Sequence, residues 1–228
     1  MDAPISREAL AKMIDHSLLK PMLTREDTIA GLKVAIKHNV AAATVKPCYV
    51  PLAAEMLAGT GIFTNPVICF PLGYDTTETK AFQTRQLVEQ GADEIDMMMN
   101  VGALLGGDYD YVRDDIAAVV EAAGGKTVKV ILEVAYLNDY HIVRACQLCE
   151  QARAHFVKTS SGFAPEGYTI ENLKLMRATV SQKVQVKAAH GVRSLASALE
   201  VIEVGVTRFG ATQTEKIMAE WEEAYGGR

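Results

Sequence analysis

The chain has 228 residues, of which 49% are hydrophobic and 22% charged, and its formal net charge at pH 7 is -5. This composition is typical of a folded globular protein and argues against a disordered chain. The mild charge, with basic residues dispersed along the sequence, argues against nucleic acid or an anionic membrane surface as a partner. We therefore expect a small-molecule ligand, with any anion bound locally.

The first twenty residues, MDAPISREALAKMIDHSLLK, carry charges inside every apolar stretch. They contain neither the hydrophobic region of a signal peptide nor a membrane span, so we expect a cytoplasmic protein. Cys146 and Cys149 form a C-x-x-C, which suggests zinc or redox chemistry. A redox pair belongs at a helix N-terminus and a zinc site needs further ligands, whereas NDYHIVRACQLCEQAR indicates one amphipathic helix with the pair in its middle. We predict two buried thiols and no metal site.

Short apolar runs alternate with longer amphipathic segments along the chain, which indicates repeated βα units after a short leading helix around SREALAKMI. The predicted strands, in chain order, are IDHSLL, VAAATVK, PVICF, DEIDMMMN, TVKVILEV, AHFVKT, KVQVKAA and VTRFG. Eight parallel strands close a barrel, so we predict an α/β fold in which residues 1–228 form a single-domain parallel (β/α)8 TIM barrel. A doubly wound open sheet is the competing architecture, but its G-x-G-x-x-G motif is absent after the first strand.

The predicted helices begin after residues that favour helix N-caps. Thr24 precedes REDTIAGLKVAIKHN, Thr76 or Thr77 precedes ETKAFQTRQLVEQ, and Asp108 precedes YDYVRDDIAAVVEAA. The positions of these caps agree with the alternation of strands and helices.

Three charged residues lie late in predicted strands, where an apolar residue is expected: Asp96, Lys158 and Lys187. The C-terminal ends of barrel strands form the active face of this fold. Strand alternation places Val186 on the helix-facing side and Lys187 inside the barrel. The same rule places Lys158 inside, and Glu94 inside together with Asp96. An acid and two lysines can therefore converge at one end of the barrel.

Two lysines and a carboxylate in a dry pocket favour a specific chemistry. Desolvation and a neighbouring cation both lower the pKa of a lysine, which frees its amine to attack a carbonyl. One lysine then acts as the nucleophile, the second activates it, and the carboxylate moves protons. Taken singly, each residue has another explanation, since a lysine near a strand end often reaches solvent and an aspartate there often caps a helix.

Small residues follow the later strands, where backbone N–H groups at helix N-termini can bind a phosphate. They are Ser160, Ser161 and Gly162 after the sixth predicted strand, Gly191 beside His190 after the seventh, and Gly210, Ala211 and Thr212 at the eighth. Thr44 and Thr159, which end the second and sixth predicted strands, are expected to line the substrate pocket. Two further residues, His16 and Lys46, lie at strand ends and have either a site role or a structural one.

The chain resembles deoxyribose-phosphate aldolase, a class I aldolase family, over most of its length. FVKTSSGF and GADEIDMMMNVGAL are the most specific shared motifs, and DHSLLKP, FPLG, KVILE, VKAAHGVR and TRFGAT support them. The resemblance implies a lyase of carbohydrate degradation that reversibly cleaves 2-deoxyribose 5-phosphate to acetaldehyde and glyceraldehyde 3-phosphate, without a metal or organic cofactor. It also implies that Lys158 forms the Schiff base, Lys187 activates it and Asp96 relays protons, and that Asp15, near Lys187, is one of the substrate-binding residues.

The resemblance places the phosphate-binding backbone on Gly162, Gly191 and Gly210. The family usually has two glycines where this chain has His190 and Gly191, and serines where it has Thr212 and Gln213. A histidine at a close-approach position either clashes with a phosphate or donates to it. An unphosphorylated acceptor for the same aldol chemistry therefore stays open as an alternative.

Two rivals remain from the sequence. One is a barrel that binds a sugar phosphate without catalysis, its lysines serving as anion ligands, and the other is a sugar-phosphate isomerase with Asp96 as base. We expect the chain to form a homodimer or a higher homo-oligomer. Tyr225, near the end of the chain, receives no role.

Overall fold

The computed structural model describes residues 3–226 and consists of eight parallel strands that close into a barrel. The strands are β1 (Ile14–Leu18), β2 (Ala42–Val45), β3 (Phe63–Ile68), β4 (Glu94–Met98), β5 (Thr127–Ile131), β6 (Phe156–Lys158), β7 (Gln185–Ala188) and β8 (Arg208–Ala211). Each strand pairs with the next in sequence, and β1 pairs with β8 to close the ring. The predicted TIM barrel is therefore confirmed, and the open sheet is wrong.

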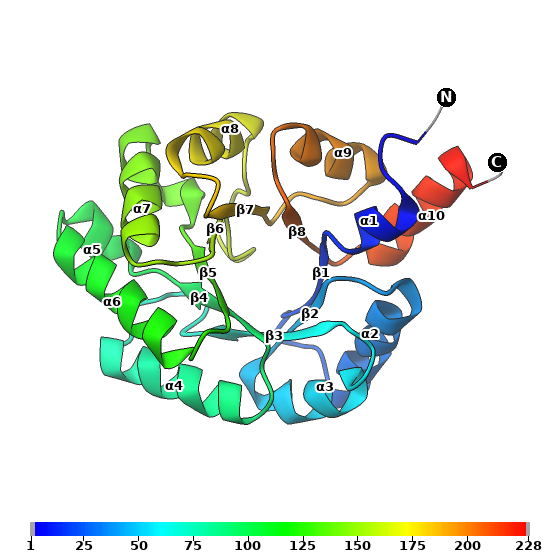
Figure 1. Ribbon diagram of the computed structural model, residues 1–228, viewed down its shortest axis with the longest axis horizontal. Helices are drawn as coiled ribbons and strands as arrows, with labels where there is room; N and C mark the ends of the chain where they lie inside the picture. The colour runs from blue at the N-terminus through cyan, green and yellow to red at the C-terminus, as the bar shows by residue number, and fades with distance from the viewer. Residues whose placement is uncertain (1–2, 227–228) are drawn as a thin grey trace.

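The helices surround the barrel as an outer ring, which Figure 1 shows in a view down the barrel. The α-helices are α1 (Arg7–Ala11), α2 (Arg25–His38), α3 (Val50–Leu57), α4 (Thr77–Glu89), α5 (Val101–Leu105), α6 (Tyr109–Ala122), α7 (Asp139–Gln151), α8 (Ile170–Thr179), α9 (Leu195–Glu203) and α10 (Thr214–Tyr225). Two 3-10 helices, η1 (Pro47–Tyr49) and η2 (Val134–Tyr136), follow β2 and β5. The leading helix α1 lies beside α10, the last helix of the barrel (Figure 1). None of the helices within residues 3–226 is long and apolar enough to cross a membrane.

Two of the three predicted N-cap residues make a capping hydrogen bond. Thr24 accepts a hydrogen bond from the Asp27 backbone N–H, and the Asp27 carboxylate accepts one from the Thr24 N–H, which completes a capping box at α2. Thr76 is the residue that caps α4, by accepting from the Thr79 N–H. Asp108 occupies the N-cap position of α6, but its side chain makes no capping bond.

Strand β3 begins at Phe63, three residues before the predicted PVICF segment. Proline has no backbone N–H for the hydrogen bonds between strands, so a proline in the sequence suggests the first residue of a strand. Here Pro66 lies within β3 opposite Val45, and the chain before it already pairs with β2, beginning at Phe63 opposite Ala42. The predicted start of β3 was therefore three residues too late.

The apolar core lies between the barrel and its ring of helices. Alternate strand residues such as Ile95, Val157 and Val186 are fully buried on this side. Cys146 and Cys149 are buried on α7 as free thiols, as predicted. Burial raises the pKa of the Cys146 thiol to about 12 and that of Cys149 well above its usual value, so both are unreactive at neutral pH. The opposite faces of the strands point into the barrel and carry polar and charged side chains.

A buried ion pair joins two helices of the outer ring. Lys80 of α4 and Asp115 of α6 are almost fully buried, with Lys80 Nζ 2.6 Å from Asp115 Oδ2. Thr77 Oγ1 also donates to Asp115 Oδ1, at 2.8 Å. We expect Lys80→Met to lower the free energy of unfolding by about 3 kcal/mol, because it leaves a buried carboxylate without its cation.

Urea denaturation measures this loss. The matched control is Lys37→Met, which removes the exposed pair between Lys37 and Glu215 and should change stability little. The double variant Lys80→Met, Asp115→Leu should recover most of the loss, since no unpaired charge stays buried. Equal stability of Lys80→Met and the control would contradict this account of the pair.

Candidate active site

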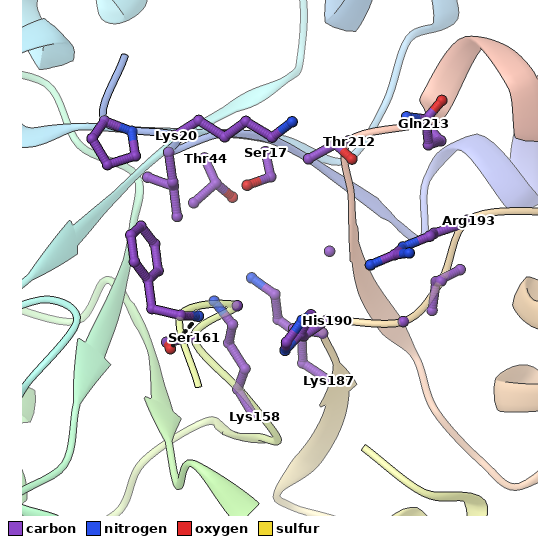
Figure 2. Close-up of a pocket in the computed structure, with 18 residues that line it drawn as sticks. Ser17, Lys20, Thr44, Lys158, Ser161, Lys187, His190, Arg193, Thr212 and Gln213 are labelled. Atoms are coloured by element: carbon purple, nitrogen blue, oxygen red, sulfur yellow. Dashed lines mark hydrogen bonds between the residues drawn. The ribbon is translucent and has the colours of Figure 1, made fainter. Parts of the chain in front are cut away.

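A pocket of about 540 Å³ opens at the C-terminal ends of the strands. Figure 2 shows Lys158 and Lys187 on one side of it and Lys20, Thr44 and Ser17 on the other, with both lysine side chains directed into the space between. In addition to these two lysines, the predicted site residues that line the pocket are Thr44, Gly162, His190, Gly191, Gly210 and Thr212. The later strands and the loops after them therefore form most of one continuous cavity.

The two lysines meet at a single carboxylate oxygen. Asp96 is fully buried, and its Oδ2 accepts hydrogen bonds from Lys158 Nζ and Lys187 Nζ, each at 2.7 Å. Its Oδ1 accepts from Lys129 Nζ at 3.2 Å and from Asn65 Nδ2 at 3.0 Å. The structure thus brings together the acid and the two lysines that strand alternation placed inside the barrel.

The surroundings of Asp96 fix its charge. Burial alone would raise the pKa of this carboxyl, but the ammonium groups of Lys129, Lys158 and Lys187 outweigh burial and hold the pKa well below its usual range. Asp96 is therefore a carboxylate at neutral pH in the resting site. In the resting site it holds both amines in place.

Lys187 lies between two buried carboxylates. Its Nζ lies 2.5 Å from Asp15 Oδ2 as well as 2.7 Å from Asp96 Oδ2. Burial lowers the pKa of Lys187 to about 8, because desolvation and the nearby Lys158 and Lys129 ammonium groups outweigh the attraction of the two carboxylates. Burial also opposes the ionised form of Asp15, but the cations around it hold the pKa of that carboxyl well below its usual range. Lys187 therefore exchanges its proton close to neutral pH.

Two basic residues of the barrel interior were missed in the sequence. Lys129 of β5 lies 2.5 Å from Glu94 Oε2, and Arg208 of β8 donates to Glu94 and Asp15. The alternation rule places Lys129 inside the barrel, because Val128 and Val130 face the helices. Lys129 lies in the middle of β5, however, and site residues were expected at the C-terminal ends of strands. We name the following seven side chains the barrel ion network: Asp15, Glu94, Asp96, Lys129, Lys158, Lys187 and Arg208.

Basic side chains also stand around the pocket mouth. Lys20 follows β1, His190 follows β7, and Arg193 precedes α9 (Figure 2). His190 has a left-handed backbone, with φ 66°, and its Nδ1 is buried with no hydrogen-bond partner among residues 3–226. Gly167 packs against it so closely that a Cβ there would lie 1.7 Å from the His190 carbonyl oxygen. The loop that carries His190 is therefore held in one place at the pocket edge.

Two buried residues brace the loops from behind. Thr159 Oγ1 donates to the Ala189 carbonyl at 3.1 Å and accepts from the Ala189 N–H at 2.9 Å, so it ties the ends of β6 and β7 together and lies outside the pocket lining. Glu133 accepts from the Ser161 N–H at 3.0 Å and from the Ser161 hydroxyl, which fixes the segment that carries Gly162. Glu133 ends the KVILE motif and follows β5 with φ 56°, but the sequence suggested no role for its side chain.

Two residues with ambiguous roles do not reach the pocket lining. His16 faces outward from β1, and its Nδ1 lies 2.8 Å from Thr214 Oγ1 of α10. Burial lowers the pKa of His16 to about 4, so it is neutral at pH 7. Lys46 donates to the Leu23 carbonyl at 2.6 Å. Both make structural contacts.

Comparisons with known proteins agree with this geometry. The family model described as DeoC/LacD family aldolase matches residues 10–212. The deoxyribose-phosphate aldolase of Clostridium novyi is 50% identical over 210 residues, which cover 92% of this chain and 95% of that protein. That of Staphylococcus epidermidis is 47% identical over 208 residues, which cover 91% and 94%. The solved tetrameric deoxyribose phosphate aldolase of Aeropyrum pernix matches with a TM-score of 0.88 and 27% identity, over 96% of this chain and 93% of its own. The chain therefore belongs to the DeoC/LacD family of aldolases, and it is a lyase.

Proposed function

We propose that this aldolase reversibly cleaves 2-deoxy-D-ribose 5-phosphate to acetaldehyde and D-glyceraldehyde 3-phosphate through an imine on Lys158. The observation that carries the proposal is the pair of lysine amines on one buried carboxylate, facing a pocket with a basic mouth. The resemblance of the sequence and the names of its relatives support the same substrate.

The reaction follows from the position of Lys158. Its Nζ attacks C1 of the open-chain sugar, and loss of water gives a protonated imine. A base then removes the proton of the C3 hydroxyl, the bond between C2 and C3 breaks, and its electron pair moves toward the iminium nitrogen. Glyceraldehyde 3-phosphate leaves, and an enamine stays on Lys158. Protonation of C2 and hydrolysis release acetaldehyde and restore the amine.

The proton transfers fall to Lys187 and Asp96. A group transfers protons best when its pKa lies near the working pH, and the pKa of Lys187 is lowered to about 8. Asp96 links Lys187 to Lys158 through its Oδ2, and as a carboxylate it stabilises the positive charge that the imine carries. We therefore assign proton donation to Lys187, with Asp96 as the link through which the proton of the C3 hydroxyl is taken up by way of a water.

The phosphate of this substrate fits the mouth of the pocket. The pocket mouth is lined by three glycines, Gly162, Gly191 and Gly210. Lys20 and Arg193 supply positive charge there. Anions bind where backbone N–H groups and basic side chains meet at the end of a barrel. A coupled assay for glyceraldehyde 3-phosphate tests the proposal, which requires its release from 2-deoxyribose 5-phosphate in equal amounts with acetaldehyde. Exchange of a substrate C–H proton without C–C cleavage would instead support the isomerase.

His190 distinguishes the phosphorylated substrate from the alternative acceptor. Its ring lines the pocket beside Arg193, a position from which a ring N–H can donate to a phosphate oxygen. We expect His190→Gly to raise KM for 2-deoxyribose 5-phosphate about tenfold and to leave kcat/KM for unphosphorylated 2-deoxyribose nearly unchanged. Glycine tolerates φ 66°, so the loop should keep its shape.

Steady-state kinetics with both sugars measures this effect. Arg153→Gly, at an exposed position that also has a left-handed backbone and lies outside the pocket lining, is the control. If His190→Gly instead improves turnover of the phosphorylated sugar, the ring obstructs the phosphate, and the unphosphorylated acceptor becomes the better proposal. The non-catalytic rival is not retained, because the family to which the chain belongs is one of enzymes.

We also propose that the chain forms a homodimer or a higher homo-oligomer. Leu72 and Tyr74, which precede α4, and Phe82 within it are each more than half exposed. Large apolar side chains that are exposed in a single chain are often covered in protein contacts. Light scattering after size-exclusion chromatography tests the proposal, and a monomer at micromolar concentration would contradict it.

A further inference from the structure

Arg208 and Glu94 are two of the buried charged side chains of the barrel interior that take no part in the proposed mechanism. Arg208 donates from Nε to Asp15 Oδ1 at 2.8 Å, and from Nη1 and Nη2 to the two carboxylate oxygens of Glu94 at 3.2 and 2.9 Å. Neither Arg208 nor Glu94 is among the residues that line the pocket. Any effect that they have on the reaction must therefore pass through the groups between them and the substrate.

The barrel ion network contains one more basic side chain than acidic ones. Its basic members are Lys129, Lys158, Lys187 and Arg208, and its acidic members are Asp15, Glu94 and Asp96. All seven are buried; the most exposed of them, Arg208, has 9% of its surface accessible. A surplus charge in a desolvated interior is costly, and a group that can lose its proton removes it.

Two of the four basic groups keep their protons. Burial opposes the charge of Arg208, but Asp15 and Glu94 outweigh it and raise its pKa. Lys129 lies within 3.5 Å of three carboxylates, and their attraction outweighs burial and raises its pKa as well. The proton that balances the network must therefore leave the pair formed by Lys158 and Lys187.

The two amines of this pair share one hydrogen-bond acceptor. Both amines bind the same oxygen, Asp96 Oδ2, so the state of one depends on the state of the other. The pKa of Lys187 is lowered to about 8, in the direction that the surplus positive charge requires. A neutral Lys187 can then take a proton from Lys158 across the shared oxygen, which frees the Lys158 amine.

We propose that Arg208 and Glu94 are positioning residues that set the protonation of the Lys158–Lys187 pair. Arg208 supplies the surplus positive charge that drives one amine to its neutral, nucleophilic form, and Glu94 limits this effect. The inference rests on the proposed function, because a neutral amine matters to the reaction only if Lys158 forms the imine.

Other charged or titratable groups also face the pair. They are Asp15 from β1, Asp96 from β4, Lys129 from β5, and Lys20, His190 and Arg193 around the pocket. The last three stand on the open side of the pair, where water screens them. Glu133 is buried nearby, but its carboxylate is held by Ser161, and within residues 3–226 it forms no ion pair with the network. The surplus therefore arises within the network itself.

The test measures the pH dependence of imine formation. Enzyme is mixed with acetaldehyde at each pH, the imine is trapped with borohydride, and ethylation of the Lys158 peptide is followed by mass spectrometry. The wild type should gain reactivity with rising pH, over the range in which Lys187 loses its proton. Arg208→Gln should move the midpoint up by about one pH unit, and Glu94→Gln should move it down by about as much.

Opposite shifts distinguish charge control from a merely structural role. The double variant Arg208→Gln, Glu94→Gln should return the midpoint close to the wild-type value, and Arg208→Lys should keep it there. The control is Arg177→Gln, since the hydrogen bonds that Arg177 makes within residues 3–226 all go to backbone carbonyls, including that of Val184 just before β7. A structural role would lower the rate in the single variants without moving their midpoints in opposite directions.

The outcomes separate this inference from the proposed function. If the wild type forms no imine, the proposed function fails and the inference with it. If the wild type forms the imine on Lys158 but the two single variants keep its midpoint or shift it in the same direction, only the inference fails. Should Arg208→Gln not fold, as judged by circular dichroism, the direction of the shift in Glu94→Gln decides.

Discussion

Lys158→Met should lower kcat for cleavage of 2-deoxyribose 5-phosphate by about ten-thousand-fold or more. The variant removes the amine that forms the covalent intermediate, and loss of a nucleophile typically has an effect of this size. Lys187 cannot take its place, because its Nζ is held between Asp15 and Asp96, at 2.5 and 2.7 Å. Methionine fills a similar volume, so the barrel should keep its fold.

Lys158→Arg provides the second arm of this experiment. It keeps a cation beside Asp96 but has no amine that forms a stable imine, so it should be as inactive as Lys158→Met. The matched control is Lys183→Met, an exposed lysine just before β7, which should retain full activity. Stopped-flow and overnight endpoint assays together cover the expected range. Substantial turnover by Lys158→Arg would show that the positive charge suffices and that no imine on Lys158 is required.

Asp96→Asn should lower kcat/KM by about a thousandfold. The substitution keeps the size of the side chain but removes the negative charge that holds the two amines and stabilises the imine. It should also lower the free energy of unfolding by about 3 kcal/mol, since the ammonium groups around it lose a buried partner. The control is Asp110→Asn, which removes an exposed carboxylate that pairs with Arg113.

The same variant has a defined effect on pH dependence. The negative charge of Asp96 opposes the low pKa of Lys187, so its removal should lower that pKa further below 8. Imine formation, although slower, should then reach its plateau at a lower pH than in the wild type. An Asp96→Asn enzyme with wild-type kcat/KM would exclude the carboxylate from the mechanism, and an upward shift of the midpoint would contradict the charge account of the network.

The fold and the centre of the site could be predicted because both depend on short-range periodicity. Alternation along each strand needs only a few residues, and it correctly placed Lys158, Lys187 and Asp96 inside the barrel. Parallel strands in register then bring such residues together, as Lys158 lies opposite Lys187 on the paired strands β6 and β7. The convergence of three side chains therefore followed from eight strands and their phase.

The remaining features depend on contacts between distant segments. Arg208 contacts Asp15 from 193 positions away, and Glu133 reaches Ser161 through a left-handed backbone that no local pattern announces. Thr159 illustrates the opposite case: its position at a strand end suggested the pocket, whereas its hydroxyl binds the backbone of Ala189. Which side of a loop a short polar residue faces is settled by tertiary packing.

The identity of the residue that bonds to the substrate is the central claim, and borohydride trapping with acetaldehyde tests it most directly. The enzyme is incubated with acetaldehyde, reduced, digested and mapped by mass spectrometry, with Lys158→Met as the blank. The account predicts one ethylated peptide, which contains Lys158 and is absent from the variant. An adduct on Lys187, or no adduct under conditions in which the enzyme turns over, would contradict it.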